Sequence, residues 1–234
     1  MYFEVDNMSE SIEPGISYFL AEDLSKFRSA FISQCGPSRY FDKETILSRS
    51  GGSDSPMYFI LEGIAKIYTI NPHGYIRILG YHRRNTLCAM DRIRPEDPAI
   101  VTVECVTPME VLPVTMDDIM ELSRKDEELT YRLLRYYGKV LRLMCFDAEV
   151  KSIDSVRTRM ASFLYLYAES MRNVSTYEIK LTQEELSYAV NASRVQVARI
   201  SSEFQKKGLI EHKRGRILVL DKEKLLAVSS GAEV

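Results

Sequence analysis

Cysteine is scarce in this sequence and is not clustered. The 234 residues contain four cysteines, Cys35, Cys88, Cys105 and Cys145. No two of them form a Cys-x-x-Cys pair, which is the spacing of zinc ribbons and redox motifs, and they do not have the dense spacing of a disulfide framework. We therefore expect reduced thiols and no metal site.

Long apolar runs are also missing. No stretch of the sequence approaches the roughly 18 uninterrupted apolar residues that identify a membrane-spanning helix. The opening residues, MYFEVDNMSESIEPG, are acidic and polar, whereas a secretory signal is basic and then apolar. We expect a cytoplasmic protein that does not associate with membranes.

The composition is that of a globular protein. Hydrophobic residues make up 45% of the chain and charged residues 27%, which excludes disordered and collagen-like classes. At the usual size of protein domains, a chain of 234 residues is expected to form two modest domains.

Charge is unevenly distributed along the chain. Residues 151–234 carry 14 Lys and Arg against 10 Asp and Glu, whereas residues 1–150 carry 17 against 23. A basic segment on an acidic protein is typical of a site for a polyanion, although a charge run is also common on a solvated face. The basic residues between positions 191 and 220 are Arg194, Arg199, Lys206, Lys207, Lys213, Arg214 and Arg216.

Residues 40–114 have the pattern of short strands separated by turns. At least six strands at such close spacing indicate a jelly roll or a small barrel. Before them, Leu20, Leu24, Phe27 and Phe31 lie at helical spacing, and we expect one β domain over residues 1–116. The clearest strands are expected at 58–61, 64–70, 75–81, 101–106 and 111–114, with a turn at 71–74 that includes Pro72.

A heptad pattern follows the β domain and predicts a long helix of about 24 residues within the segment 117–150. Its seam would remain in contact with water unless it packed on another surface. We interpret it as the interface of a two-fold dimer; packing on the chain's own β domain is the alternative. The seam consists of Leu129, Leu133, Tyr136, Val140, Leu143, Asp147 and Val150, of which residues 129, 133, 136, 140 and 143 are assigned to the dimer interface.

The segment 151–234 predicts a helix over 156–171, a short strand and then two short helices. Thr182 and Glu185 have the spacing of a capping box that starts the first short helix. Ser193 can cap the second, which is expected to run to about Lys207 and to bury Val197, Ile200 and Phe204. Two short helices joined by a tight turn form a helix-turn-helix.

A β-hairpin wing is expected after the second helix. Gly208 ends the helix, and residues 209–211 and 217–220 flank a basic turn at 213–216. These features together predict an α+β protein.

The stretch LTQEELSYAVNASRVQVARISSEFQKKGLIEHKRGRILVLD resembles the winged helix-turn-helix of the Crp/Fnr superfamily of bacterial transcription regulators. The order of parts is similar too, because FDKETIL and MYFILEGIAKIY look like the superfamily's β-roll. The resemblance implies a cyclic-nucleotide-binding-like roll, a long dimerisation helix and a DNA-binding domain, although the roll alone could also suggest a cupin.

The resemblance places the recognition helix at Ser193–Arg199. It implies that Arg194 and Arg199 contact bases and phosphates, for which the guanidinium fork is suited. The superfamily's usual glutamate is replaced by Val195, which can contact a thymine methyl group but cannot accept a hydrogen bond. We expect Gln196 to read adenine. The remaining DNA-binding residues are expected to be Thr182, Ser193, Lys213 and Arg216.

The known cofactors of the superfamily fit poorly. Residues 88–90 and 99–100 stand where cyclic-nucleotide members carry a glutamate and an arginine, so we do not expect cyclic AMP. Only Cys35 lies near the N-terminus, where the iron–sulfur branch needs a cysteine cluster. For haem, Met90 stands where a histidine ligand is required. His73 and His82 are interpreted as ordinary surface or strand residues.

The segment KIYTINPHGYIRILGYHRRNTL resembles the regulators of halophenol respiration, in which a chlorinated aromatic acid lies between the roll and the long helix. The resemblance implies an effector site formed by Tyr81, Asn85, Leu87, Tyr136 and Lys139. A lysine ammonium can pair with an aromatic anion and favour its ionised form. Tyr136 also lies on the heptad seam, and the dimer core is its alternative place.

We therefore expect a homodimeric transcription regulator and not an enzyme. It would bind an inverted-repeat operator and RNA polymerase under the control of a small organic effector. A haem- or redox-sensing regulator of the same fold is the first alternative. A cupin-like metalloenzyme is the second, although its metal site would need clustered imidazoles that three scattered histidines do not supply.

Overall fold

The computed structural model of the protein describes residues 17–53, 56–71, 73–91, 94, 97–153, 155–169, 177–213 and 215–230. Residues 1–16, Pro72, Met171 and Arg214, all part of the predictions above, lie outside this range. Backbone contacts divide the chain into two units, with residues 19–141 in one and residues 142–234, together with the N-terminal residues to Tyr18, in the other. The boundary falls inside a helix, and the division at residues 116 and 150 stays a prediction.

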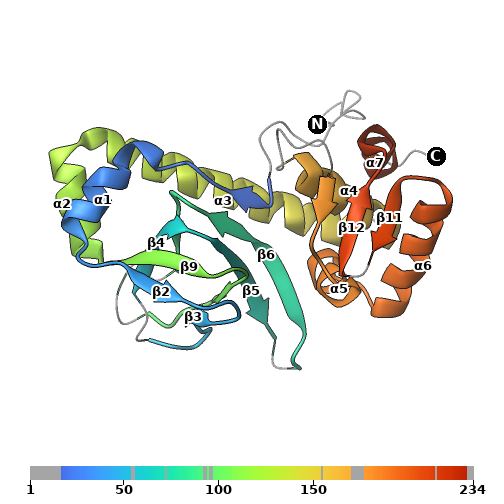
Figure 1. The fold of residues 1–234 in the computed structure, drawn as a ribbon, viewed down its shortest axis with the longest axis horizontal. Coiled ribbons are helices and arrows are strands. Elements are labelled where there is room, and N and C mark those ends of the chain that lie inside the picture. The colour runs from blue at the N-terminus through green and yellow to red at the C-terminus, as the bar shows by residue number, and fades with distance from the viewer. Residues whose placement is uncertain are drawn as a thin grey trace, which may run out of the picture. The chain divides into compact units, whose positions relative to one another are not determined.

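The unit of residues 19–141 is a β-roll with helices (Figure 1). One sheet has the strand order β1-β6-β5-β8-β3 and the other β2-β9-β4-β7. The strands are β1 (Phe19–Leu20), β2 (Arg39–Phe41), β3 (Ile46–Ser48), β4 (Met57–Glu62), β5 (Ile64–Ile70), β6 (Ile76–Arg83), β7 (Leu87–Cys88), β8 (Thr102–Cys105) and β9 (Met109–Val114). The helices are the 3-10 turn η1 (Ser25–Phe27), α1 (Arg28–Gln34), α2 (Met116–Lys125) and α3 (Glu127–Ile153), of which residues 127–141 belong to this unit.

Strand β4 is covered on both faces, which explains why its sequence is apolar almost throughout. Tyr58 and Ile60 point into the core between the two sheets, while Phe59 and Leu61 point the other way into a second core beneath the helices. Because side chains alternate along a strand, a strand that is covered on both faces needs apolar residues at every position. Phe59 stacks on Phe31 of α1 with ring centroids 4.4 Å apart.

The tight connection between β4 and β5 depends on Gly63. Its φ is +99°, and a Cβ atom there would lie 2.6 Å from the carbonyl oxygen of Pro108. No other residue fits this turn without displacing the backbone of the neighbouring strand.

The helical segment after β9 consists of two helices, of which α3, with 27 residues, corresponds to the predicted long helix. A capping box between Thr115 and Asp118 starts α2, which ends at Lys125. The backbone of Asp126 is extended, and its side chain accepts a hydrogen bond from Glu128 N at 3.0 Å. This carboxylate satisfies a free donor at the start of α3, so the chain forms two helices where one was predicted.

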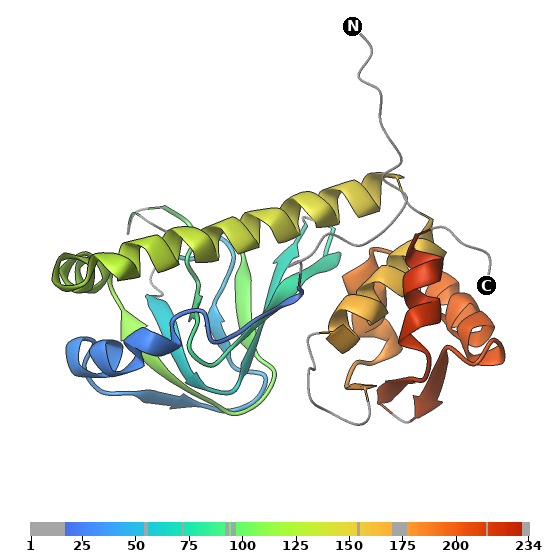
Figure 2. The ribbon, with the colours of Figure 1, turned by 90° about the horizontal axis from the view of Figure 1, so that it is seen from above.

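Most of the predicted dimer seam is buried within a single chain, which favours the alternative interpretation, packing on the chain's own β domain. Leu129, Leu133 and Tyr136 are 0%, 9% and 0% exposed and pack in the core beneath the helices, with Val140 against them. Leu143 is 3% exposed. Leu129, Leu133 and Tyr136 are thus covered by the chain's own residues, and a dimer through this seam stays a prediction. Figure 2 shows α3 running along the roll.

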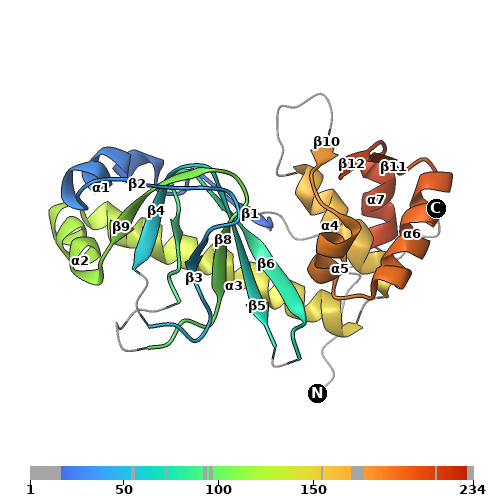
Figure 3. The same cartoon turned by 60° about the horizontal axis from the view of Figure 1, so that its bottom comes forward.

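In its described part, the second unit contains the end of α3, a small sheet and the helices α4 to α7 (Figure 3). Its strand order is β10-β12-β11, and β12 is antiparallel to both neighbours. Helix α7 was missed by the sequence analysis, although Asp221 at its N-cap accepts a hydrogen bond from Lys224 N at 2.9 Å. The elements are α4 (Val156–Glu169), β10 (Tyr177–Ile179), α5 (Gln183–Val190), α6 (Arg194–Lys206), β11 (Ile210–Lys213), β12 (Arg216–Val219) and α7 (Lys222–Ser229).

Candidate nucleic-acid interface and effector site

Helix α5 begins at the capping box that the sequence predicted. The side chain of Thr182 accepts a hydrogen bond from Glu185 N at 3.1 Å, and Thr182 N donates to the Glu185 carboxylate at 2.9 Å. Two free backbone donors are satisfied in this way. Thr182 therefore stands at the N-terminal end of the first helix of the pair, with its hydroxyl engaged in the cap.

The turn between α5 and α6 is held by an arginine of α4. Asn191 ends α5 with a φ of +50°, which reverses the chain in the space of one residue. Arg159 donates to the carbonyl oxygens of Val190 and Asn191 at 2.9 and 3.0 Å. This cation satisfies acceptors at the negative end of the helix dipole and connects α4 to the turn.

Helix α6 begins at a second capping box, in which Gln196 takes part. The Gln196 side-chain oxygen accepts hydrogen bonds from Ser193 N and Ser193 Oγ at 3.1 and 3.0 Å, and Gln196 N donates to Ser193 Oγ at 3.2 Å. Reading adenine requires both the acceptor and the donor of this amide. The cap uses this acceptor, so contact with adenine requires the cap to open, and the role predicted for Gln196 stays a prediction.

The remaining predicted residues lie on the open face of α6. Val197, Ile200 and Phe204 are at most 3% exposed, which confirms the predicted buried face. Val195 is 79% exposed, a high value for an apolar residue in a helix. Arg194 and Arg199 are exposed on either side of it. The helix thus presents two guanidinium groups and one branched apolar side chain to the outside.

The wing is longer than predicted. Lys213 and Arg216 face each other as the last residue pair of the β11–β12 hairpin, where a turn was expected. Arg216 forms an ion pair with Glu178 of β10 at 3.2 Å, and Lys213 with Glu211 at 3.5 Å. Both cations are nearly half exposed, so they remain accessible to a phosphate that replaces these carboxylates.

On the roll, Tyr136 of α3 bonds to the start of β7. Its hydroxyl donates to the carbonyl oxygen of Leu87 at 2.6 Å and lies 2.9 Å from His82 Nδ1. His82 Nδ1 is itself 2.7 Å from the same carbonyl oxygen. The structure therefore brings together Tyr136 and Leu87, as predicted for an effector site, and adds His82, which the sequence analysis had set aside.

Burial determines the protonation of this group. Desolvation lowers the pKa of His82 to about 4, so its imidazole is neutral near pH 7. Desolvation also raises the pKa of Tyr136 well above its ordinary value. The phenol consequently keeps its proton and acts as a donor.

Lys139 is paired within the chain. Its ammonium group forms an ion pair with Asp23 Oδ1, and the Asp23 side chain is only 10% exposed. The other oxygen of Asp23, Oδ2, is buried without a hydrogen-bond partner. Sequence analysis missed Asp23 because it lies 116 residues from Lys139, beyond the range of any spacing pattern.

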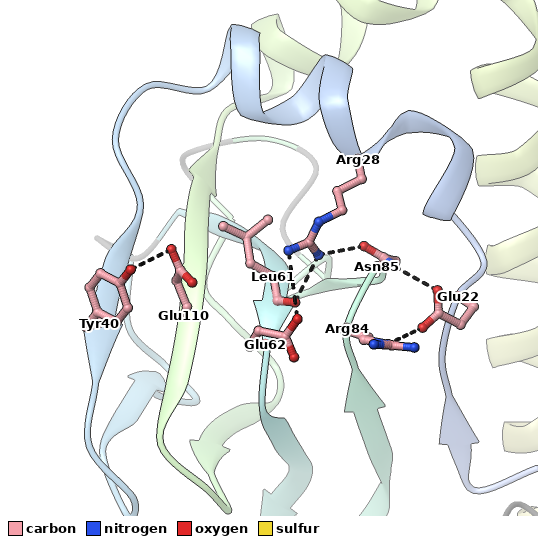
Figure 4. A network of polar contacts seen from close by, with 8 residues as sticks. All are labelled: Glu22, Arg28, Tyr40, Leu61, Glu62, Arg84, Asn85 and Glu110. Carbon is pink, nitrogen blue, oxygen red and sulfur yellow. Dashed lines mark hydrogen bonds and ion pairs between the residues drawn. The ribbon is translucent and has the colours of Figure 1, made fainter.

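The last two predicted effector residues have different surroundings. Tyr81 is 2% exposed and stacks on Phe19, with ring centroids 4.9 Å apart. Asn85 belongs to a polar network in which it accepts from Arg28 at 2.9 Å and donates to Glu22 at 2.7 Å. Figure 4 shows this network, in which Arg28 also donates to the Leu61 carbonyl oxygen at 2.9 Å. Both ends of the Asn85 amide are thus occupied by the chain.

Desolvation makes three of the cysteines poor nucleophiles. Desolvation raises the pKa of Cys35 and of Cys105 to about 11 and raises that of Cys88 further. A thiol that keeps its proton reacts slowly. Within the described residues, no three His, Cys, Asp or Glu side chains are grouped so that they could hold a metal ion.

Across the described residues, no helix has the length and apolar character needed to cross a membrane.

Comparison with known proteins identifies both units. Residues 38–126 match the family model of the cyclic nucleotide-binding domain, and residues 158–228 match that of the Crp-like helix-turn-helix domain. The cAMP-activated global transcriptional regulator Vfr of Pseudomonas aeruginosa is 24% identical over 202 residues, which cover 83% of this chain and 94% of Vfr.

Solved structures show the same fold. OCPA-complexed CprK superimposes with a TM-score of 0.69 at 19% identity, and the match covers 95% of this chain and 100% of CprK. A transcriptional regulator of the CRP/FNR family from Thermus thermophilus gives a TM-score of 0.70 at 21% identity, over 82% of this chain and 98% of that one. Vfr and the Thermus thermophilus protein are transcriptional regulators, in agreement with the expectation that this chain is not an enzyme. With an N-terminal roll of the cyclic nucleotide-binding class, a long helix and a Crp-like helix-turn-helix, the chain belongs to the Crp/Fnr family of DNA-binding transcription regulators.

Proposed function

We propose that the protein is a homodimeric, sequence-specific regulator whose roll binds a small anionic aromatic effector. The DNA-binding part of this proposal rests on the open face of α6. An arginine pair flanks an apolar side chain that is 79% exposed, on a helix fixed by caps and a buried face. Arginine forks suit guanine O6 and N7, and a valine suits the methyl group of thymine.

The experiment for this part is selection from randomised duplexes. The purified protein is incubated with a pool of random DNA, and bound sequences are recovered and aligned. A two-fold dimer should select an inverted repeat whose half-sites lie about one helical turn apart, roughly 34 Å. Recovery of unrelated sequences would contradict sequence-specific reading. Half-sites in direct repeat would contradict the two-fold arrangement.

The dimer is proposed to form through a different face of α3 from the one that the sequence analysis chose. Leu134, Tyr137 and Leu141 are 67%, 37% and 64% exposed and repeat at intervals of three and four residues, which is the spacing of a two-stranded coiled coil. Gly138 lies beside them, and a Cβ atom there would meet nothing within 4 Å. A glycine in a helix costs stability, and close approach of a second helix supplies a reason for it.

The effector site is proposed at Tyr136 and Lys139. Support comes from the pairing of Lys139 with Asp23, because it shows that this cation can bind a carboxylate. An aromatic acid could replace Asp23 at the ammonium and place its ring near Tyr136. It could act on DNA binding only by stabilising one arrangement of the dimer more than the other.

The effector is best found by a thermal-shift screen of aromatic acids, cyclic nucleotides and haem. Each compound that raises the melting temperature is then tested for its effect on DNA binding. A carboxylate-bearing aromatic should stabilise the protein. Stabilisation by haem alone would instead favour the haem-sensing alternative. RNA polymerase remains the expected protein partner at promoters.

A further inference from the structure

Glu184 lies at the edge of the proposed DNA-reading face and is bound to its first arginine. It is in the first turn of α5, and its carboxylate forms an ion pair with Arg194 Nη2 of α6. The same carboxylate accepts a hydrogen bond from the Tyr188 hydroxyl at 2.6 Å. Tyr188 lies one turn further along α5, so the carboxylate is held by its own helix while it contacts the next.

Neither folding nor helix formation explains this pairing. The Arg194 and Glu184 side chains are 64% and 43% exposed, and ion pairs at such exposure contribute little to stability. An acid in a first turn does favour the helix dipole, but Glu185 supplies the capping carboxylate there. Neither fold stability nor the helix dipole therefore accounts for the contacts of Glu184 with Arg194 and Tyr188.

A carboxylate is unfavourable on a surface that approaches DNA. Phosphates repel it, and the repulsion grows as water leaves the interface. A base edge differs from a phosphate because guanine O6 and N7 are neutral acceptors. A carboxylate beside an arginine therefore opposes phosphate binding by that arginine more than it opposes base binding.

We propose that Glu184 is a positioning residue that determines specificity, by reserving Arg194 for a base. It holds one edge of the guanidinium at Nη2 and leaves the other edge open toward the groove. In non-specific complexes the carboxylate competes with phosphate for the same cation, which weakens binding to random DNA. This inference rests on the proposed function, in which α6 reads the major groove.

The test compares Glu184→Gln with a matched control, Glu223→Gln. Glu223 is an exposed acid in the first turn of α7, so its loss changes the net charge and the helix-dipole interaction in the same way. Dissociation constants are measured for the selected operator and for a random duplex at several salt concentrations. Thermal melting of the free proteins verifies that both variants are folded.

Glu184→Gln should tighten binding to random DNA and lower the ratio of specific to non-specific affinity at least fivefold. The salt dependence for random DNA should steepen by about one unit, because Arg194 gains a phosphate contact. The selected sequence should lose preference at the base pair that faces Arg194. Tyr188→Phe, which releases the carboxylate without changing charge, should shift the ratio in the same direction by a smaller factor.

A double variant separates positioning from general electrostatics. If Glu184 acts through Arg194, Glu184→Gln should change the affinity ratio in an Arg194→Ala background no more than Glu223→Gln does. Equal effects of Glu184→Gln and Glu223→Gln in the parent protein would overturn the inference and leave sequence-specific binding intact. If the parent protein selects no sequence, the proposed function itself fails.

Discussion

Tyr136 and Leu87 join the long helix to the roll through one buried hydrogen bond, 2.6 Å from the tyrosine hydroxyl to the leucine carbonyl oxygen. Both residues are at most 1% exposed, so water does not replace this bond when it opens. The bond is therefore a buried structural link between the roll and α3.

The first prediction concerns this bond. Tyr136→Phe removes the donor and leaves the ring in place, so the free energy of unfolding should fall by about 1–2 kcal/mol. Urea denaturation measures it. Tyr137→Phe is the control, because the Tyr137 hydroxyl makes a longer bond of 3.3 Å to Met90 and its residue is 37% exposed. Equal losses of unfolding free energy for the two variants would show that the Tyr136 bond stabilises the protein no more than the Tyr137 bond.

The second prediction concerns the dimer. Leu134→Asp changes an exposed residue of α3 and should give a folded monomer, because it places charges opposite one another in the proposed interface. Leu133→Asp, one residue away, introduces a charge into the chain's own core and should cost about 3–5 kcal/mol of folding stability. Sedimentation and circular dichroism distinguish the two results. A Leu134→Asp dimer at low micromolar concentration would move the interface elsewhere.

The third prediction concerns the competition at Lys139. Asp23→Asn removes the carboxylate that holds this cation, so an anionic aromatic acid from the screen should bind more tightly. Lys139→Ala should abolish binding of the same acid, since its counter-ion is lost. Calorimetry measures both, with Lys43→Ala as a control on a surface ion pair of the roll. Unchanged affinity in both variants would place the effector away from α3.

Sequence and structure agree where the signal is local. The caps at Thr182 and Ser193 and the buried stripe of α6 follow from residues three or four apart, so sequence analysis predicted them correctly. The seam at Leu129 was read correctly as helical and buried, but a heptad pattern does not tell whether the covering surface is the chain's own sheet or a second copy. The contact of Asp23 with Lys139 depends on the tertiary fold alone.

The cap also gives Gln196 a second possible role. Sequence analysis placed this residue on the outward face of a helix, which is correct, and then assigned its amide to DNA. At the third position of the helix, however, a glutamine can turn back to the N-cap and complete a capping box. Two roles compete for one acceptor, and helix periodicity carries no information on that competition.

The fourth prediction concerns acid. Because burial lowers the pKa of His82 to about 4, the unfolded chain binds a proton between about pH 6.5 and 4 that the folded chain does not. Stability is therefore complete above pH 6.5 and declines as the pH falls toward 4, by at most about 1.4 kcal/mol per pH unit. Urea denaturation of His82→Gln should show a shallower decline. Burial lowers the pKa of His212 as well, so His212→Gln measures how much His212 contributes to the loss of stability in acid. A slope unchanged by His82→Gln would assign the acid sensitivity to other groups.

The fifth prediction separates base reading from capping on α6. Val195→Glu restores an acceptor at a position that is 79% exposed, so selection from random half-sites should shift toward cytosine, whose exocyclic amine donates to a carboxylate. Gln196→Ala should act differently. It removes the capping acceptor, costs about 1 kcal/mol of stability and should leave the preferred base at each position unchanged. If Gln196→Ala alters the selected sequence while Val195→Glu does not, the recognition helix presents position 196 to the bases, and the cap of the free protein must open when DNA binds.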